Sequence, residues 1–329
     1  MEKTGNPIRK VISAMTAMQR FPWEQGTAAQ SLYEMGLDEL WIPMAYDAVK
    51  RQSRDGRLAL VGGIAAVSDP AVNGEVCIRA YEKTKDPFFK EGYEKMLSYL
   101  LKNAPRTKDG IICHNNVSFQ KEFSAKQLWI DGLYMVPPFL ACAGLVREAY
   151  FQIQGYIRTL FDPKASLFFH IADTEQERFV RKLHWATGNG WAAMGIARVL
   201  EEAEKAGEEE IREKLLSFEK KVLSSMISLA GEDGRFHDIL DDPSSFIDGT
   251  SSMMAASAVY RGIAKGYLPK EWKTWADRSF NSVSGRINSY GLLYEVCGCP
   301  DFMKSGTSCE AQAAYLMSCA WKEKAEAVS

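Results

Sequence analysis

The 329-residue sequence lacks any run of 18 consecutive apolar residues, so no segment is predicted to cross a membrane. It also lacks an excess of charge of one sign, because 40 Lys and Arg residues are balanced by 42 Asp and Glu residues. Electrostatic binding to nucleic acid or to an anionic membrane is therefore not expected. The N-terminal segment has no apolar stretch and no cleavage site typical of a secretion signal, which favours a cytoplasmic protein.

The common signatures of metal and cofactor sites are absent as well. The four histidines form no i, i+4 pair, and the seven cysteines form no C-x-x-C motif, the nearest approach being Cys297-Gly-Cys299. The segment Gly188-Asn-Gly190 follows no predicted strand and so does not indicate a dinucleotide site. We expect no metal, no organic cofactor, and free thiols in a reducing compartment.

Segments rich in Val and Ile do not alternate with helical segments, which argues against a βαβ fold. Instead, a polar residue followed by Gly precedes a helix-favouring, Ala-rich segment six times, with the glycines 48, 58, 58, 59 and 57 residues apart. The six dipeptides are Gln25-Gly26, Asn73-Gly74, Asp131-Gly132, Asn189-Gly190, Asp248-Gly249 and Ser305-Gly306. Because Asp, Asn and Ser are preferred N-cap residues, we predict that a helix begins at most of these dipeptides.

A second series of turn signals lies between these dipeptides, each followed by a short apolar run. Its members are Asp55-Gly56, Asp109-Gly110, Ala165-Ser166, Asp233-Gly234 and Tyr290-Gly291. The repeating unit is a helix, a turn, a second helix and a short extended loop, about 57 residues long. An open array of such units needs polar terminal caps, whereas a closed ring does not. We predict an all-α fold, an (α/α)6 barrel of six helical hairpins, as one domain over residues 1–329.

In such a ring the six inner helices begin at the same end, where a concave ligand site is expected. The helix starts would bring Trp23, Glu24, Asn73, Trp129, Asp131, Trp185, Asn189, Trp191 and Asp248 to this end, and the preceding loops Asp69, His114, His170, His237 and Asp238. Aromatic rings with carboxylates and imidazoles suit a sugar, because the rings stack on C–H faces and a carboxyl group can transfer protons.

Each of these residues also has a structural explanation. Asp131 and Asp248 are good N-caps, the tryptophans can simply fill the core, and the histidines recur at similar offsets after a turn. The sequence pattern alone leaves both explanations open.

The segment from Trp129 to Met135, WIDGLYM, resembles the WxDGLYM signature of glycoside hydrolase family 105, the unsaturated rhamnogalacturonyl hydrolases, which are related to the family 88 glucuronyl hydrolases. Further similarities keep the order found in that family and span roughly residues 20–260. They lie at residues 23–26, 68–74, 110–114, 167–170 and 188–191.

This resemblance implies a helical barrel and a hydrolase that acts on the 4,5-unsaturated uronic acid left by polysaccharide lyases. The enzyme protonates C4 of the vinyl ether, water adds at C5, and the rest of the small oligosaccharide is released without any cofactor. By resemblance, Asp131 is the general acid/base and Asp69 is the second catalytic carboxylate. The residues implied to bind the sugar are Trp23, His114, Trp129, His170, Thr187, Asn189 and Trp191.

The sequence departs from the family at Thr187, where Arg commonly precedes Gly-Asn-Gly-Trp. The loss of a cation near the sugar puts recognition of the uronate carboxylate in question, with Arg181 and Arg235 as candidate replacements. A stretch at residues 115–124 resembles an insertion and is expected to reshape the mouth of the barrel.

Alternative functions on the same barrel are a glycosidase for saturated sugars, a sugar epimerase, or a sugar-binding protein without activity. A general acid must hold its proton at the working pH, so we expect burial and repulsion from Asp69 to raise the pKa of Asp131. The aglycone, the linkage and the oligomeric state do not follow from the sequence.

Overall fold

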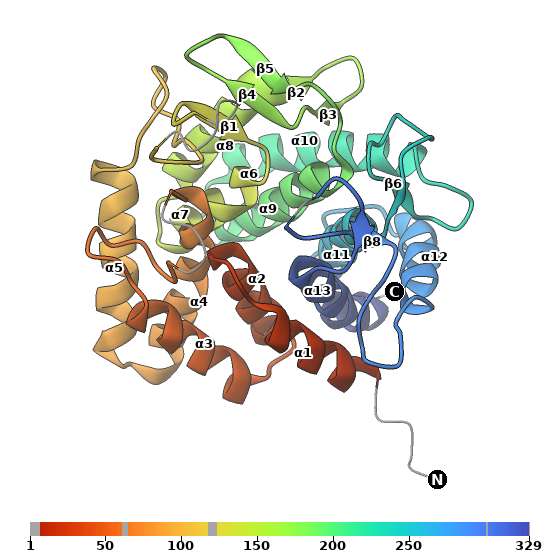
Figure 1. Cartoon of the computed structure of the whole chain (residues 1–329), viewed down its shortest axis with the longest axis horizontal. Coiled ribbons are helices and arrows are strands. Elements are labelled where there is room, and N and C mark those ends of the chain that lie inside the picture. Colours follow the sequence, from red (N-terminus) through yellow and green to blue (C-terminus); the bar gives the residue numbers. More distant parts are fainter. Residues whose placement is uncertain (1–6, 61–64, 118–123, 301, 329) are drawn as a thin grey trace.

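Helices in two concentric rings make up the computed structural model, which describes residues 7–60, 65–117, 124–300 and 302–328 (Figure 1). The inner ring consists of α2 (Pro22–Glu34), α4 (Ser68–Thr84), α6 (Gly132–Met135) followed by α7 (Pro137–Cys142), α9 (Ala186–Lys205), α11 (Gly249–Ala264) and α13 (Cys309–Glu326). The outer ring consists of α1 (Pro7–Met18), α3 (Asp38–Lys50), α5 (Pro87–Lys102), α8 (Val146–Leu160), α10 (Glu209–Ser228) and α12 (Trp272–Ser284).

The ring of inner helices is closed. Each inner helix packs against the next one along the chain, and α13 packs against both α11 and α2. The outer partner of α13 is α1, so the N-terminal helix completes the sixth hairpin. The prediction of an (α/α)6 barrel is confirmed, and closure explains why no polar capping repeat is needed.

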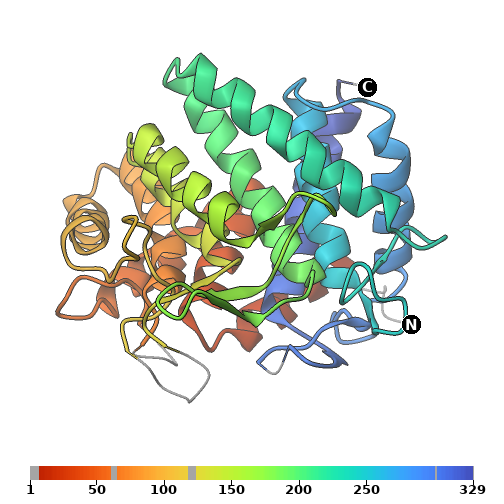
Figure 2. The same cartoon turned by 90° about the horizontal axis from the view of Figure 1, so that it is seen from above.

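Short antiparallel strands lie among the loops on one side of the helices (Figure 2). They are β1 (Gln127–Trp129), β2 (Phe161–Asp162), β3 (Leu167–Phe168), β4 (Ile171–Asp173), β5 (Arg178–Arg181), β6 (Phe236–His237), β7 (Ile247–Asp248), β8 (Val296–Cys297) and β9 (Ser305–Gly306). The largest sheet has the order β1-β4-β5, with Trp129 opposite Ile171. These strands link neighbouring loops at the mouth of the barrel.

The second series of turn signals is a structural feature of the barrel. Its central residues all have left-handed backbone angles, with φ of 105° at Gly56, 84° at Gly110, 57° at Ser166, 86° at Gly234 and 85° at Gly291. Gly is favoured in this region because it has no Cβ. Each turn reverses the chain after an outer helix and directs it to the mouth.

The predicted helix starts need correction. Only α6 and α11 begin at their dipeptides, whereas α2, α4 and α9 begin three to five residues earlier, and Ser305-Gly306 forms strand β9 ahead of α13. The glycines matter instead for helix packing: a Cβ at Gly26 would lie 2.3 Å from Val72 Cγ1, and one at Gly74 would lie 2.4 Å from the Phe139 ring. The repeat therefore marks close contacts between inner helices more than it marks N-caps.

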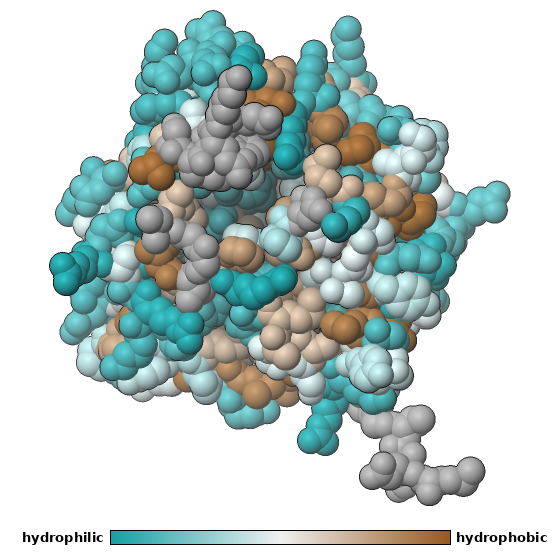
Figure 3. All heavy atoms as spheres, viewed as in Figure 1, coloured by the Kyte–Doolittle hydropathy of each residue, from teal (hydrophilic) through white to brown (hydrophobic). Residues whose placement is uncertain are grey.

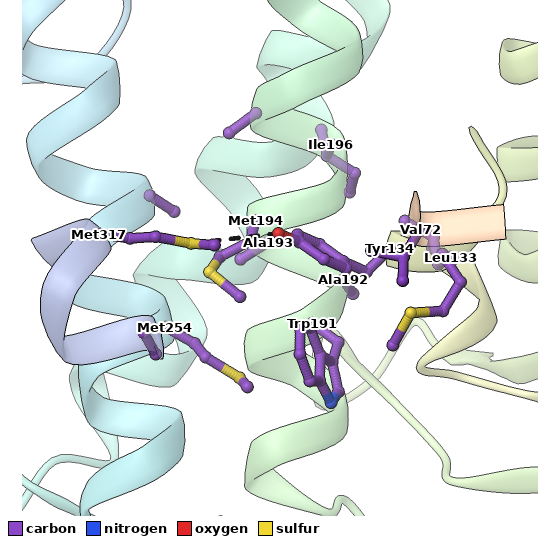
Figure 4. Close-up of a cluster of buried hydrophobic side chains, with 14 of the residues drawn as sticks. Val72, Leu133, Tyr134, Trp191, Ala192, Ala193, Met194, Ile196, Met254 and Met317 are labelled. Atoms are coloured by element: carbon purple, nitrogen blue, oxygen red, sulfur yellow. Dashed lines mark hydrogen bonds between the residues drawn. The ribbon is translucent and has the colours of Figure 1, made fainter. Parts of the chain in front are cut away.

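The centre of the barrel is packed with side chains from several inner helices (Figure 4). Trp191 from α9, Met254 from α11 and Met317 from α13 meet there with Tyr134 from α6, whose ring lies 4.7 Å from that of Trp191. This layer separates the mouth from the opposite end of the barrel.

Below this layer, the opposite end holds a buried ion network. Arg198 contacts Glu34 at 2.5 Å and Glu75 at 2.9 Å, and Arg261 also contacts Glu34, at 3.0 Å. The Tyr134 hydroxyl donates to Gln30, which donates to Glu75, so the network reaches the hydrophobic layer. Buried charges of this kind require partners, because desolvation otherwise disfavours the ionised forms.

All seven cysteines are free, as expected. Across the part of the chain that the structure describes, no helix is both long and apolar enough to span a bilayer.

Candidate active site

A cavity of about 120 Å³ lies at the mouth where the inner helices begin. Its lining residues are Trp23, Asp69, His114, Trp129, Asp131, Met135, His170, Arg181, Trp185, Trp191, Phe302 and Glu310. The face viewed in Figure 3 has hydrophilic residues over most of its periphery. Of the residues expected at this end, Glu24, Asn73, His237 and Asp238 do not line the cavity, and neither do Thr187, Asn189 and Asp248, which are described below.

Backbone hydrogen bonds between loops hold the two histidines at the mouth. The Val67 N–H donates to the His114 carbonyl at 2.9 Å, and the His114 N–H donates to the Gln127 carbonyl at 3.0 Å. The Ile130 N–H donates in turn to the His170 carbonyl at 3.1 Å. These bonds connect the start of α4 to strand β1 and to the loop before β4, so residues distant in sequence are fixed side by side.

Asp69, His114 and Asp131 form the polar centre of the cavity, with one ligand atom of each within 4.8 Å of the others. His114 Nδ1 lies 3.5 Å from Asp131 Oδ2 and shares a 2.7 Å hydrogen bond with Ser68 Oγ. Asp131 Oδ1 is buried and has no hydrogen-bond partner among the described residues. One oxygen of Asp131 therefore remains available for a ligand.

Burial raises the pKa of both carboxyl groups. For Asp69 the pKa rises to about 6, because burial and the neighbouring Asp131 outweigh the attraction of His114 and the hydrogen bond of Ser68. The pKa of Asp131 is also raised by burial, against the opposing effect of His114. Two close carboxyl groups with raised pKa values can hold a proton near neutral pH, as a general acid requires.

Aromatic rings form the walls around this centre. The His114 ring stacks on Trp129 with centroids 4.4 Å apart, and the His170 ring stacks on Trp185 at 4.3 Å. Burial, and then the positive charge of Arg181, lower the pKa of His170 well below its usual value. His170 is therefore a neutral imidazole, which can both donate and accept a hydrogen bond.

Asp131 and Asp248 have different roles in the structure, although the sequence allowed either residue to be a helix cap or a site residue. Asp248 caps α11, since its carboxylate accepts from the N–H groups of Thr250 at 2.8 Å and Ser251 at 3.1 Å. It also accepts from the Cys297 N–H at 2.8 Å and does not line the cavity. Asp131 occupies the N-cap position of the four-residue helix α6, but its side chain makes no capping hydrogen bond. Its carboxyl group is turned to the cavity instead.

Two of the residues expected to bind the sugar do not line the cavity, which corrects that expectation. The Thr187 hydroxyl donates to Asp248 Oδ2 at 2.6 Å, and Thr187 is 1% exposed. The Asn189 amide clamps a loop, accepting from the Phe168 N–H at 2.8 Å and donating to the Phe168 carbonyl at 3.0 Å. Both residues lie in the first turn of α9, and their side chains are bonded to protein groups and not turned to the cavity.

The two candidate replacements for the missing Arg lie in different places. Arg235 is bound by Asp233 at 2.6 Å and Glu295 at 2.5 Å and does not line the cavity. Arg181, at the end of β5, does line it, and it is the only Lys or Arg among the described lining residues. A guanidinium group is therefore present at the mouth, although it comes from a strand and not from α9.

Sequence reasoning missed three lining residues: Met135, Phe302 and Glu310. Glu310 is the second residue of α13, the position that Asp69 occupies in α4. The equivalence was hidden because the last helix was expected to start at Ser305-Gly306 and begins at Cys309. Phe302 lies in the β8–β9 loop, where its ring approaches those of Trp23 at 6.4 Å and Trp185 at 5.8 Å. Much of the insertion-like stretch, residues 118–123, falls outside the described residues.

Two clusters of the described residues have enough donor groups for a cation, namely Asp69 with His114 and Asp131, and Glu24 with Cys299 and Glu310. In the first, His114 Nδ1 is already engaged by Ser68 and Asp131. In the second, Glu24 accepts from the Arg20 guanidinium at 3.0 Å. The absence of a metal remains a prediction from the sequence.

Comparison with known proteins gives a consistent result. A family model described as Glycosyl Hydrolase Family 88 matches residues 3–313. The chain is 28% identical over 322 residues to the unsaturated rhamnogalacturonyl hydrolase YesR of Bacillus subtilis (strain 168), covering 92% of this chain and 87% of that protein.

Solved structures share the fold. A possible member of the GH105 family from Klebsiella pneumoniae superposes with a TM-score of 0.82 at 17% identity, over 98% of this chain and 92% of that one. An unsaturated glucuronyl hydrolase responsible for the degradation of glycosaminoglycan, from Bacillus sp. GL1, gives a TM-score of 0.67 at 16% identity, over 90% and 83% of the two chains.

Proposed function

The chain belongs to Glycosyl Hydrolase Family 88 and is a glycoside hydrolase, and we propose that it removes a 4,5-unsaturated uronic acid from the non-reducing end of a short oligosaccharide. The observation that carries this proposal is the buried pair Asp69 and Asp131, both with raised pKa values, in a cavity walled by aromatic rings. The similarity to YesR supports the same substrate class.

In the proposed reaction Asp131 donates its proton to C4 of the C4=C5 double bond. The positive charge that develops at C5 and the ring oxygen is stabilised by the Asp69 carboxylate, at close range in a site of low polarity. Water then adds at C5 and gives its proton to Asp131, which restores the acid. The C5 hemiketal opens to a ketone, and the hemiacetal thereby formed at C1 expels the remaining sugar as an alcohol.

His114 is proposed to position Asp131. Its ring is fixed by stacking on Trp129 and by the hydrogen bond to Ser68, which leaves Nδ1 3.5 Å from Asp131 Oδ2. Restricting one oxygen of Asp131 leaves Oδ1 to face the substrate. A fixed orientation of this kind lowers the entropy cost of reaching the transition state.

The substrate carboxylate is proposed to bind Arg181, the guanidinium group among the lining residues. Arg can bind a carboxylate through two parallel hydrogen bonds. Arg181 is thus proposed to take the role in carboxylate recognition that was expected at position 187, because the Thr187 hydroxyl is already bonded to Asp248. The sugar ring is proposed to stack among Trp23, Trp185 and Trp191, as aromatic faces do with C–H groups.

The experiment that tests the function is a screen of unsaturated oligosaccharides made by lyases from pectin, ulvan and glycosaminoglycans. Hydrolysis consumes the conjugated double bond, so the ultraviolet absorbance of the substrate should fall as the shorter sugar is released. Saturated glycosides and epimerisable sugars form the control panel. If sugar is released from the saturated glycosides while the absorbance of the unsaturated oligosaccharides stays constant, the alternative of an ordinary glycosidase is supported instead.

A further inference from the structure

Glu310 lies across the barrel from Asp131. The inner ring runs α2, α4, α6–α7, α9, α11 and α13, so α6 and α13 occupy opposite positions in a ring of six (Figure 1). Glu310 is the second residue of α13, and Asp131 immediately precedes α6. Both line the same cavity. A ligand in that cavity thus has a carboxyl group on each side.

The side chain of Glu310 has the features of a ligand-binding group and not of a helix cap. Glu310 is 1% exposed, and its Oε2 atom has no hydrogen-bond partner among the described residues. The capping of α13 is done by Ser308, whose hydroxyl accepts from the Ala311 N–H at 3.2 Å. A buried polar atom without a partner destabilises the folded protein, so a protein keeps one most readily where a ligand satisfies it.

We propose that Glu310 is a substrate-binding residue, whose Oε2 forms a hydrogen bond to a ring hydroxyl of the unsaturated sugar on the side away from Asp131. This inference rests on the proposed function and extends it, because it assigns the recognition of that hydroxyl to α13. It also explains why Glu310 lines the cavity although the proposed chemistry needs only Asp131 and Asp69.

The surroundings of Glu310 keep its carboxyl group neutral, so it can donate as well as accept. Burial raises its pKa to about 8, with further contributions from Glu24 of α2 and Asp248 at the start of α11. The opposing influences are the backbone N–H of Glu310 itself and the Arg20 guanidinium ahead of α2. The nearby Cys299 thiol is neutral, since its own pKa is raised by burial and by Glu310 and Glu24.

The protonation state of Glu310 predicts the direction in which substrate affinity changes with pH. Below pH 8 the neutral acid donates its hydrogen bond, and above pH 8 the carboxylate loses this donor and repels the anionic substrate. The pKa of Asp69, about 6, lies below this window, so its titration is largely separate. Binding through Glu310 should therefore weaken as the pH rises through 8.

The test measures binding by calorimetry to full-length protein carrying Asp131→Asn, which stops turnover. The probe is an unsaturated disaccharide that the wild-type enzyme hydrolyses. In this background Glu310→Ala should raise Kd roughly threefold to tenfold at pH 7, the loss expected for one hydrogen bond. Glu310→Gln keeps a donor and an acceptor, so its Kd should stay nearly constant between pH 7 and 9.5, whereas Kd with Glu310 intact should rise.

Glu219 provides a matched control, because it is also a fully buried Glu with a pKa of about 8, but it lies on the outer helix α10 away from the cavity. Glu219→Gln should leave Kd and its pH dependence unchanged.

If the Glu310 variants bind like the parent at every pH while the wild type hydrolyses the disaccharide, the Glu310 proposal alone is wrong. If Glu310→Ala does not fold, the pH profile of Glu310→Gln decides. If the wild type hydrolyses no unsaturated sugar, the proposed function fails and this inference with it.

Discussion

His114 Nδ1 lies 3.5 Å from Asp131 Oδ2, and its ring is held in a stack on Trp129. The two residues come from different segments, the loop after α5 and the turn before α6, and β1 lies between them in the chain. Their contact ties the proposed acid to a group that restricts its orientation, while burial keeps the pKa of Asp131 raised against the opposing effect of His114.

Asp131→Asn should lower kcat/KM by about a hundredfold or more, the usual contribution of general acid–base catalysis. The amide has nearly the same shape but cannot donate a proton to carbon. The rate of loss of double-bond absorbance measures the effect, and circular dichroism checks that the fold is retained. A folded variant with wild-type activity would remove Asp131 from the mechanism.

Asp69→Asn should move the alkaline limb of the kcat/KM profile to lower pH, in addition to reducing the rate. Activity requires protonated Asp131 and so declines as the pH rises through the Asp131 pKa. A neighbouring negative charge favours the protonated form of a carboxyl group, so its removal should lower the pKa of Asp131, while burial still raises that pKa. Measurement of kcat/KM from pH 4 to 9 for both proteins tests this, and a limb that stays in place would contradict the coupled pair.

Arg181→Gln should raise KM for the unsaturated disaccharide roughly tenfold to a hundredfold, because a charged hydrogen-bond donor to the substrate carboxylate is lost. The matched control is Thr187→Val, which removes a buried hydrogen bond to Asp248 outside the cavity. This control should lower stability by about 1 kcal/mol and leave KM unchanged. The opposite result, an altered KM only in the Thr187 variant, would mean that the carboxylate binds at α9.

Glu219→Gln should stabilise the protein at neutral and alkaline pH. The pKa of Glu219 is raised from 4.5 to about 8 by burial, so the folded state binds a proton more tightly than the unfolded state. The favourable contribution of the neutral acid is therefore complete below pH 4.5 and is lost progressively as the pH rises to 8. The gain from Gln, on the order of a few kcal/mol, should grow over this interval and then level off. Thermal unfolding of both proteins at several pH values gives the curve, and a constant difference in Tm would exclude this explanation.

Arg198→Met should destabilise the fold by about 3–5 kcal/mol, since it leaves Glu34 and Glu75 buried without their main partner. Lys214→Met is the control at the surface, where an exposed ion pair with Glu210 contributes little to stability. Urea unfolding compares the two variants. Equal stability losses would show that the ion network at the end of the barrel opposite the mouth adds little.

The sequence by itself determined the architecture. A spacing of about 57 residues recurs in both series of turn and glycine signals, and left-handed backbone angles at Gly56, Gly110 and Gly234 require residues of that kind. Because the repeat is local and regular, six hairpins and a common mouth follow from it. Most residues of the cavity were also predictable, since Trp23, Asp69 and Trp191 lie in the first two turns of inner helices.

Only the tertiary structure decided which polar groups face the cavity. Asp131 and Asp248 are each followed by Gly at a helix start. The oxygens of Asp248 accept hydrogen bonds from backbone N–H groups of its helix, whereas Asp131 makes no such capping bond. The Thr187 hydroxyl is bonded to Asp248 and does not line the cavity, while Arg181 lines it from the end of a strand. A polar side chain at a helix start bonds either its own backbone or a ligand, and loops from other repeats determine which groups remain unsatisfied. Glu310 lines the cavity and does not cap its own helix, because Ser308 already caps α13 and closure of the ring places Glu310 opposite Asp131.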